Sequence, residues 1–198
     1  EFRRVLFRSK DFITTWFSQF SYMQAQIKHM SGATDEDFEL DSNALAAFGA
    51  KTTATDYIHT LENWGMYSTQ MNIFFEKYDL YLTPTTASVA PKNGEVAMPN
   101  WQKPILKGLL KVGKAHYLAQ GKLVEKMVQE NLSWVPFTQL ANVTGLPAMS
   151  VPLYWNKNGL PLGSQFIAPF GREDRLLQLA AQLEQAQPWM PQYKNIQL

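Results

Sequence analysis

Cysteine is absent from all 198 residues of the chain. This absence excludes disulfide bonds, thiolate metal sites and a cysteine nucleophile, and it leaves the redox compartment undetermined. A large excess of charge of either sign is missing too, because the formal net charge at pH 7 is only +1. Such a balance does not favour nucleic acid or a strongly acidic partner. We therefore expect no nucleic-acid partner.

Long apolar runs are also missing. No stretch approaches the roughly 20 apolar residues that a membrane-spanning helix requires, and no signal peptide is recognisable. The composition is otherwise that of a globular protein, with 45% hydrophobic and 13% aromatic residues. We expect a cytoplasmic protein that does not associate with membranes, and the oligomeric state stays open.

Recognisable catalytic motifs are missing as well. The sequence contains no G-x-S-x-G turn, no S-x-x-K pair, no H-E-x-x-H motif and no P-loop. The three histidines, His29, His59 and His116, have no spacing to other residues that indicates a triad. Amide hydrolysis needs an activated nucleophile, a base and donors for the oxyanion. The sequence therefore predicts no catalytic residue, no metal and no organic cofactor in this chain.

The first nine residues, E-F-R-R-V-L-F-R-S, lack a starting methionine and show no persuasive periodicity. They are compatible with the translation of a restriction site followed by a sequencing adapter. We interpret residues 1–9 as a cloning or assembly remnant and exclude them from the fold. On this interpretation the natural gene continues upstream, and residues 10–198 are part of a longer protein.

Large apolar residues in the first half recur at helical spacing. Between residues 11 and 30 they alternate steps of three and four, which predicts a helix with a packed seam. The seam comprises Ile13, Trp16, Phe20, Met23, Ile27 and Met30. A ligand-lining stripe is the alternative, and core packing is the interpretation we favour. Ser42 or Asn43 is suited to cap a short helix that ends near Phe48.

Residues 35–41 resemble a calcium-binding loop, but Leu40 stands where such a loop has glycine and Ala46 where it has glutamate. We interpret them as a solvated loop or helix start. Thr53 followed by Asp56 predicts the capped start of the next helix, which reaches about residue 77. Its predicted buried face comprises Ile58, Leu61, Met71, Phe74 and Phe75.

A short strand is predicted over residues 79–83, and a proline-rich loop follows from Pro84 to Pro104. Loops of this length are typically lids or mobile connections, and we favour a substrate-side role. Four lysines then define the lysine stripe, at steps of four, four and three: Lys103, Lys107, Lys111 and Lys114. A basic helix of this kind can lie on an anionic membrane or bind an acidic partner, which would make the protein a non-catalytic binding module. A solvated lysine face is the alternative we favour.

The stretch from residue 136 to 187 carries the clearest pattern. Gly145 can end a short helix in the left-handed conformation, and Pro147 prevents its continuation. The apolar run over residues 148–153 predicts a strand buried on both faces. Its partner strand is expected over residues 163–168.

Asn158 and Gly159 supply the positive φ angles of a tight turn between these strands. The final helix buries one stripe and ends before Pro188. That stripe comprises Leu176, Leu179, Ala180 and Leu183. A unit of this helix–strand–strand–helix order cannot cover its own apolar faces, so it should belong to a larger sheet covered by helices.

Three motifs in this stretch occur in an order that resembles the amidase signature family. They read N-V-T-G-L-P-A-M-S-V-P-L, N-G-L-P-L-G-S-Q-F-I-A and R-L-L-Q-L-A-A-Q-L-E-Q-A. The ending L-E-Q-A-Q-P-W resembles the branch of 6-aminohexanoate-cyclic-dimer hydrolases. The resemblance extends back to about Asn43, through F-F-E-K-Y-D-L-Y-L-T-P-T, and covers most of the chain.

The resemblance implies an α/β fold, in which helices cover a mixed β-sheet and the first half is rich in helices. Residues 10–198 would be the C-terminal part of a single amidase-type domain. In this family a Ser–Ser–Lys triad hydrolyses carboxamides without a metal or an organic cofactor, so the implied partner of the complete enzyme is a small-molecule amide. The triad lies in an N-terminal part that has no counterpart here, and no catalytic residue is carried over.

The resemblance also implies one wall of the substrate channel. The N-V-T-G-L-P-A-M segment resembles the part that approaches the channel in this family, so Asn142, Thr144 and Met149 are candidates for lining it. Structural roles stay open for two of them. Asn142 can brace the local turn, and Met149 can be an ordinary core residue.

Overall fold

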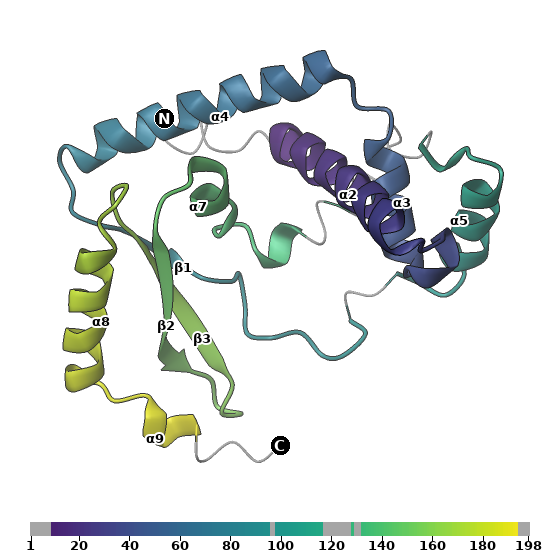
Figure 1. Cartoon of the computed structure of the whole chain (residues 1–198). Coiled ribbons are helices and arrows are strands. Elements are labelled where there is room, and N and C mark those ends of the chain that lie inside the picture. The colour runs from purple at the N-terminus through teal and green to yellow at the C-terminus, as the bar shows by residue number, and fades with distance from the viewer. Residues whose placement is uncertain (1–8, 96–97, 117–127, 129–131, 194–198) are drawn as a thin grey trace. The chain divides into compact units, whose positions relative to one another are not determined.

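A computed structural model describes residues 9–95, 98–116, 128 and 132–193, and Figure 1 shows the elements they form. Residues 1–8, most of the segment interpreted as a remnant, lie outside the described part.

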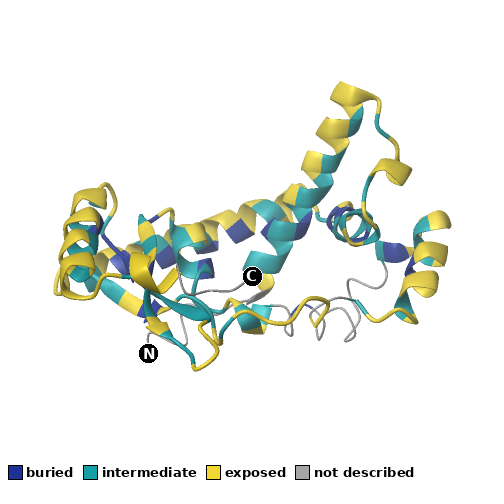
Figure 2. Ribbon diagram, turned by 90° about the horizontal axis from the view of Figure 1, so that it is seen from below, coloured by how far each residue is buried: buried dark blue, intermediate teal, exposed yellow. Residues whose placement is uncertain are grey.

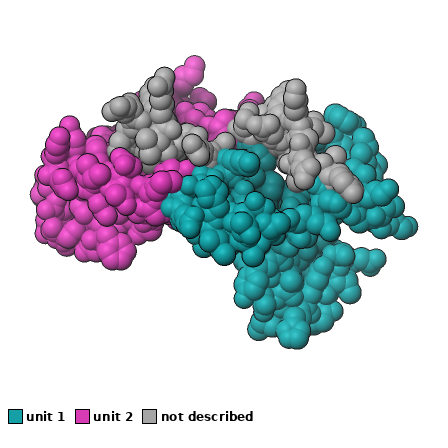
Figure 3. All heavy atoms as spheres, turned by 90° about the horizontal axis from the view of Figure 1, so that it is seen from above, with its two compact units in different colours: residues 1–63, 96–130 teal, residues 64–95, 131–198 magenta. Residues whose placement is uncertain are grey.

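The chain divides into two compact units (Figure 3). The first comprises residues 1–63 and 96–130, and the second comprises residues 64–95 and 131–198. The prediction that residues 10–198 form part of one domain stays a prediction.

The first unit is built from helices. They are α2 (Ser9–Ser31), the 3-10 helix η1 (Asp35–Asp37), α3 (Leu40–Gly49), the first part of α4 (Ala54–Phe75) and α5 (Gln102–Lys111). The helix-rich first half that apolar spacing predicted is therefore confirmed. Gly32 lies directly after α2 with φ +73°, and its N–H donates to the Lys28 carbonyl at 2.9 Å. A glycine adopts this left-handed conformation at little cost, which explains where α2 ends.

Helices α2 and α3 lie against each other at very short range around Gly49. The rings of Phe17 and Phe48 are 5.4 Å apart, and Phe17 is buried. A Cβ atom on Gly49 would overlap the carbonyl group of Phe17 and lie 2.8 Å from the Ser18 nitrogen. Only glycine therefore permits this approach of the two helix backbones.

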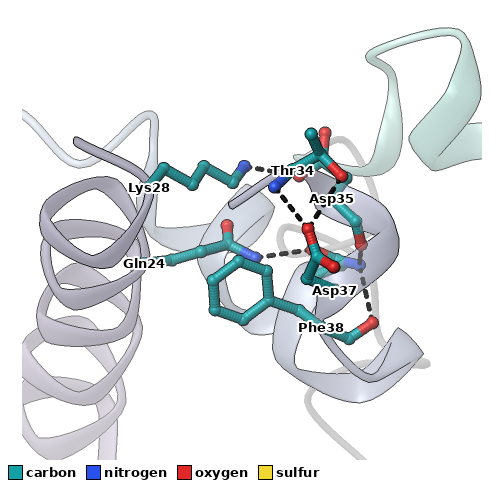
Figure 4. A network of polar contacts seen from close by, with 7 residues as sticks. Gln24, Lys28, Thr34, Asp35, Asp37 and Phe38 are labelled. Atoms are coloured by element: carbon teal, nitrogen blue, oxygen red, sulfur yellow. Dashed lines mark hydrogen bonds and ion pairs between the residues drawn. The ribbon is translucent and has the colours of Figure 1, made fainter. Parts of the chain in front are cut away.

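The connection between α2 and α3 is held by polar side chains (Figure 4). Lys28 forms an ion pair with Asp35 at 2.5 Å, and Gln24 Nε2 donates to Asn43 Oδ1. Asn43 in turn donates to the Asp35 carbonyl at 2.7 Å. The expected helix cap at Ser42 or Asn43 is wrong, because α3 already begins at Leu40. Asn43 instead braces the preceding turn.

The predicted seam of α2 is only half covered. Near the start the seam residues Ile13, Trp16 and Phe20 are half-buried, and Trp16 contacts the rings of Phe12, Phe17 and Phe20. The fully buried Thr15 and Phe17 lie outside the predicted seam. Toward the other end the seam is exposed (Figure 2), at Met23, Ile27 and Met30. Core packing is therefore the wrong interpretation for that end within the described residues. The helix itself was predicted from spacing, but spacing does not say what covers a face.

Helix α4 has the predicted start and a different buried face. The N–H of Asp56 donates to Thr53 Oγ1 at 3.1 Å, and the Thr53 hydroxyl donates to Asp56 Oδ2 at 2.7 Å. The hydrogen bond from the Thr53 hydroxyl, followed by one from the Thr53 backbone, holds the pKa of the Asp56 carboxyl below its usual value. The predicted burial of Ile58 and Leu61 is wrong, because both are exposed. The buried positions are Thr60, Asn63, Tyr67 and Met71.

Two of those buried positions are polar, which is why the pattern of apolar residues pointed to the wrong face of α4. Asn63 Nδ2 donates to Asp11 Oδ2 of α2 at 3.2 Å, and this bond lets the amide be buried.

Helix α5 packs through its leucines and ends in a Schellman motif. Leu106 is buried against Ala44 and Ala115. The N–H groups of Lys114 and Gly113 donate to the carbonyls of Leu109 and Leu110, at 2.8 and 3.0 Å. Gly113 has φ +66°, as this helix ending requires.

The predicted start of α5 at Pro104 is two residues late. Pro104 is the third helical residue, where its missing N–H has no intrahelical acceptor to lose. No helix among the described residues is long and apolar enough to cross a membrane.

The second unit is built around a three-stranded sheet with the order β1–β3–β2. The strands are β1 (Tyr81–Pro84), β2 (Ala148–Trp155) and β3 (Pro161–Ile167). The predicted α/β class is confirmed. Both pairings of β3 are antiparallel, so no parallel pair of the expected mixed sheet occurs among the described residues.

The turn between β2 and β3 is the predicted hairpin. Gly159 has φ +77°, whereas the described residues include no non-glycine residue with positive φ, so Asn158 does not share that conformation. The Asn156 side chain replaces a second left-handed residue, because its Oδ1 accepts from the N–H groups of Asn158 and Leu160, both at 2.9 Å.

Helix α8 (Glu173–Ala186) covers one face of the sheet. Leu176 packs with Val151, Phe166 and Ala168, and the stripe predicted for this helix is confirmed by Leu179 and Leu183 in the same cluster. The prediction that β2 is buried on both faces is wrong within the described residues. Ala148, Ser150 and Tyr154, which alternate with the packed positions, are exposed.

Charged residues hold the start of α8. Arg172 donates two hydrogen bonds to the Asp174 carboxylate, at 2.8 and 2.9 Å, and they lower the pKa of Asp174 to about 2. Arg175 pairs with Asp79, just before β1. The short helix α9 (Met190–Tyr193) follows, and its Tyr193 ring lies edge-on to Trp155 of β2.

The close approach at Gly49 generates a stability prediction. Gly49→Ala should lower the free energy of unfolding by at least about 2 kcal/mol, because the new methyl group meets backbone atoms that cannot move away alone. Urea unfolding followed by circular dichroism measures the change.

Gly65→Ala in α4 is the matched control. A Cβ there meets nothing within 4 Å, so the higher helix propensity of alanine should raise stability by about 0.5–1 kcal/mol. Equal effects of the two substitutions would contradict the α2–α3 contact.

Candidate functional site

The face of the sheet opposite α8, called the polar face below, carries a row of polar side chains next to the apolar Tyr81 and Ile167, and both rows follow from the strand register. Thr83 of β1 lies beside Gln165 of β3, which lies beside Ser150 of β2. The neighbouring row consists of Leu82, Phe166 and Met149. Because side chains alternate between the two faces of a sheet, the polar row and the apolar row point in opposite directions. The apolar row lies on the α8 side of the sheet, where Phe166 and Met149 pack with the helix and Leu82 is exposed.

Gln165 is the buried centre of this polar face. Its Nε2 donates to Thr83 Oγ1 at 3.3 Å and to the Phe137 carbonyl at 3.2 Å. Phe137 lies just before α7 (Gln139–Thr144), so the second bond holds the segment leading into α7 on this side of the sheet. Gln139 is buried and donates to the Val135 carbonyl at 3.4 Å. One amide side chain therefore couples all three parts of the site: β1, β3 and the approach to α7.

Two hydroxyl groups meet above Gly163. Thr85 Oγ1 and Ser150 Oγ are 2.5 Å apart, and the Thr85 N–H donates to the Gly163 carbonyl at 2.8 Å. A Cβ atom on Gly163 would overlap Ser150 Oγ and lie 2.6 Å from Thr85 Oγ1. Glycine is thus required for the hydroxyl pair, which remains exposed at the surface.

The three residues predicted to line a substrate channel divide between the two faces. Asn142 and Thr144 lie on α7, whose approach is bonded to the polar face, and Asn142 is exposed. The Thr144 hydroxyl donates to the Leu140 carbonyl at 2.7 Å. Gly145 ends α7 with φ +68°, as predicted. Met149 follows in β2, and its side chain packs against the cluster under α8.

Chemically, this arrangement can bind a neutral polar group and offers no activated nucleophile. Hydroxyl and amide groups both donate and accept, so they suit the carbonyl and N–H of an amide. The described partner of the Ser150 hydroxyl is the Thr85 hydroxyl, which is no base at neutral pH. Among the described residues no cluster of three metal-binding side chains occurs. His59 is exposed beside Glu62, as expected for a solvated residue.

Sequence reasoning missed Thr83, Thr85, Ser150 and Gln165. The available signal was weak: a serine and a glutamine interrupt two otherwise apolar strands. Their meeting depends on β1 pairing with a strand about 80 positions later, which no local pattern predicts.

A family model described as Amidase matches residues 12–177. A protein named putative amidase AmiC from Mycobacterium leprae is 37% identical over 116 residues, covering 59% of this chain and 20% of that protein. A 6-aminohexanoate-cyclic-dimer hydrolase from a Pseudomonas species is 31% identical over 166 residues, covering 82% of this chain and 30% of the relative.

A solved structure of 6-aminohexanoate cyclic dimer hydrolase superimposes with a TM-score of 0.69 at 29% identity. The match covers 91% of this chain and 35% of that one. The chain therefore spans between a fifth and about a third of the length of these relatives.

Gln165 provides a direct test of the polar face. Gln165→Leu should lower the free energy of unfolding by about 1–3 kcal/mol, because the Phe137 carbonyl loses its donor in a part-buried place. Chemical denaturation measures the change. The same exchange at exposed Gln182 of α8 is the control and should stay within about 0.5 kcal/mol of the parent. Indistinguishable variants would show that Gln165 does not hold the site together.

Proposed function

The chain belongs to the amidase family, and we propose that it is the C-terminal portion of an amidase signature enzyme that hydrolyses the C–N bond of small-molecule carboxamides. The family match across residues 12–177 carries this proposal. The likeness to the cyclic-dimer hydrolase supports linear or cyclic amides of the aminohexanoate kind as the substrate class.

We assign the catalytic step to protein outside this chain. Hydrolysis of an amide needs a nucleophile that attacks the carbonyl carbon, a base that takes its proton, and donors that stabilise the oxyanion. The exposed hydroxyl pair of Thr85 and Ser150 lacks such a base among the described residues. The Ser–Ser–Lys triad of the family would therefore be supplied by the portion of the enzyme that the relatives have beyond the matched length.

The contribution of this chain would be to position the substrate. Correct placement of an amide next to a nucleophile lowers the barrier by removing the entropy cost of bringing the groups together. Asn142 is the exposed side chain best suited to contact the amide, with Thr144 beside it on α7. Met149 follows the same turn, and its packing under α8 would make any contribution to the channel indirect.

Exposed apolar surface in each unit supports a larger enzyme around this chain. In the first unit it lies at Met23, Ile27 and Met30, and in the second at Leu82 and Tyr154. Surfaces of this kind in a family member that spans only part of its relatives are suited to packing against further protein.

The proposal is tested by a chimera. Residues 10–198 replace the matching segment of the Pseudomonas hydrolase, and the chimera and the free chain are assayed against a carboxamide panel that includes the 6-aminohexanoate cyclic dimer. The free chain should hydrolyse no amide, and the chimera should hydrolyse at least one. In the chimera, Asn142→Ala should raise KM about two- to tenfold, the loss expected for one hydrogen bond.

Lys157→Ala is the control, because this exposed lysine lies in the hairpin turn away from α7, and KM should not change. Turnover by the purified free chain would refute the assignment of catalysis to another part of the enzyme. A folded chimera without activity on any amide would refute the amidase proposal itself.

A further inference from the structure

Helix α5 presents three different stripes along its length. One packs into the first unit through Leu106, Leu109 and Leu110. The second is the lysine stripe, whose four lysines are all exposed, with Lys114 lying just after the end of the helix. The third comprises Trp101, Ile105 and Val112, which are 66%, 55% and 63% exposed and follow one another at steps of four and seven. Steps of this size keep the three residues on one side of the helix.

The sequence did not predict the exposed apolar stripe of Trp101, Ile105 and Val112. The spacing of the lysines said nothing of where Ile105 and Val112 lie. In the structure both side chains point outward, because the Schellman ending at Gly113 and the buried Leu106 and Ala115 hold the leucine stripe against the unit. A solvated lysine face explains the lysines, but it does not explain an exposed tryptophan and two exposed aliphatic residues beside them.

The charge of this segment is one-sided. Residues 99–116 contain four lysines and no acidic residue, whereas the whole chain carries only +1. Within the described residues, none of the four lysines forms an ion pair. The small net charge of the whole chain is therefore an average that hides a local cationic surface.

We propose that α5, through the lysine stripe and the stripe of Trp101, Ile105 and Val112, docks the protein on an anionic lipid surface. Lysines near such a surface are attracted to acidic headgroups, and tryptophan favours the boundary between headgroups and acyl chains. An amphipathic helix with both features lies in the plane of the interface and does not cross it. The inference does not depend on the amidase activity.

Two features favour lipid over an acidic protein partner. The exposed apolar side chains are aligned along one side of the helix next to the lysines, which suits the flat surface of a bilayer. Trp101 lies at the start of the helix, where its ring can enter the boundary between headgroups and acyl chains. Ile105 and Val112 lie on the same side of the helix and can contact the same boundary.

The test is co-sedimentation of the purified chain with phosphatidylcholine vesicles that contain about 30% phosphatidylglycerol, in about 0.1 M salt. The chain should sediment with these vesicles and remain in solution with pure phosphatidylcholine. Each lysine near the surface accounts for about a fivefold change in partitioning, so the triple variant Lys107→Gln, Lys111→Gln and Lys114→Gln should bind on the order of 100-fold more weakly.

A second triple variant removes the same charge elsewhere: Lys51→Gln, Lys77→Gln and Lys157→Gln, all exposed and outside α5. It should bind within about threefold of the parent. Trp101→Ala should weaken binding, and Phe170→Ala, which removes a similarly exposed aromatic ring in the second unit, should not. Thermal unfolding checks that every variant is folded.

The proposal is overturned if the parent chain does not sediment with anionic vesicles. Equal losses in the two triple variants would overturn it as well, because binding would then follow total charge. Binding to polyglutamate without binding to vesicles would identify an acidic polypeptide as the partner and would exclude the lipid surface.

Discussion

The pairing of β3 with a strand on each side is the interaction on which the second unit depends. A central strand must satisfy backbone groups along both edges, and β3 does so with β1 and β2 at once. This double pairing determines the register, and the register places Thr83, Gln165 and Ser150 in one row and their apolar neighbours in the other. The core under α8 and the polar face opposite are therefore two results of one hydrogen-bond pattern.

Under the proposed function, the polar face would serve binding while another part of the enzyme would carry catalysis. The Gln165 side chain donates hydrogen bonds that hold β1 and the approach to α7. Gly163 leaves room for the hydroxyls of Thr85 and Ser150. Such a surface is preorganised, because its groups are held by the sheet and not by a flexible loop. In the proposed enzyme it would help to orient a neutral amide, and the groups that break the bond would come from elsewhere.

The first unit depends on close backbone contact in place of a sheet. Gly49 lets α2 and α3 approach, and the network around Asp35 and Asn43 closes their connection. Helix α5 is then packed by one stripe only, so its other two stripes are displayed together. The same rule governs both units: a helix or strand covered on one side leaves its remaining side chains available for contact with something else.

The sequence by itself determined the local features of this protein. The extent of α2, the box at the start of α4, the stop at Gly145 and the turn at Gly159 follow from residue spacing, side-chain capping and the conformational freedom of glycine. The order of three motifs was sufficient to indicate the amidase family.

Only the tertiary structure decided which surfaces are covered and which residues meet. The buried face of α4 includes Thr60 and Asn63 because a bond from Asn63 to Asp11 compensates its burial, and no apolar pattern reveals such a bond in advance. Tertiary packing also decided three other features: the exposed end of α2, the open face of β2 and the polar row of the sheet. Spacing along the chain fixes which side chains share a face, whereas long-range pairing and packing decide what that face touches.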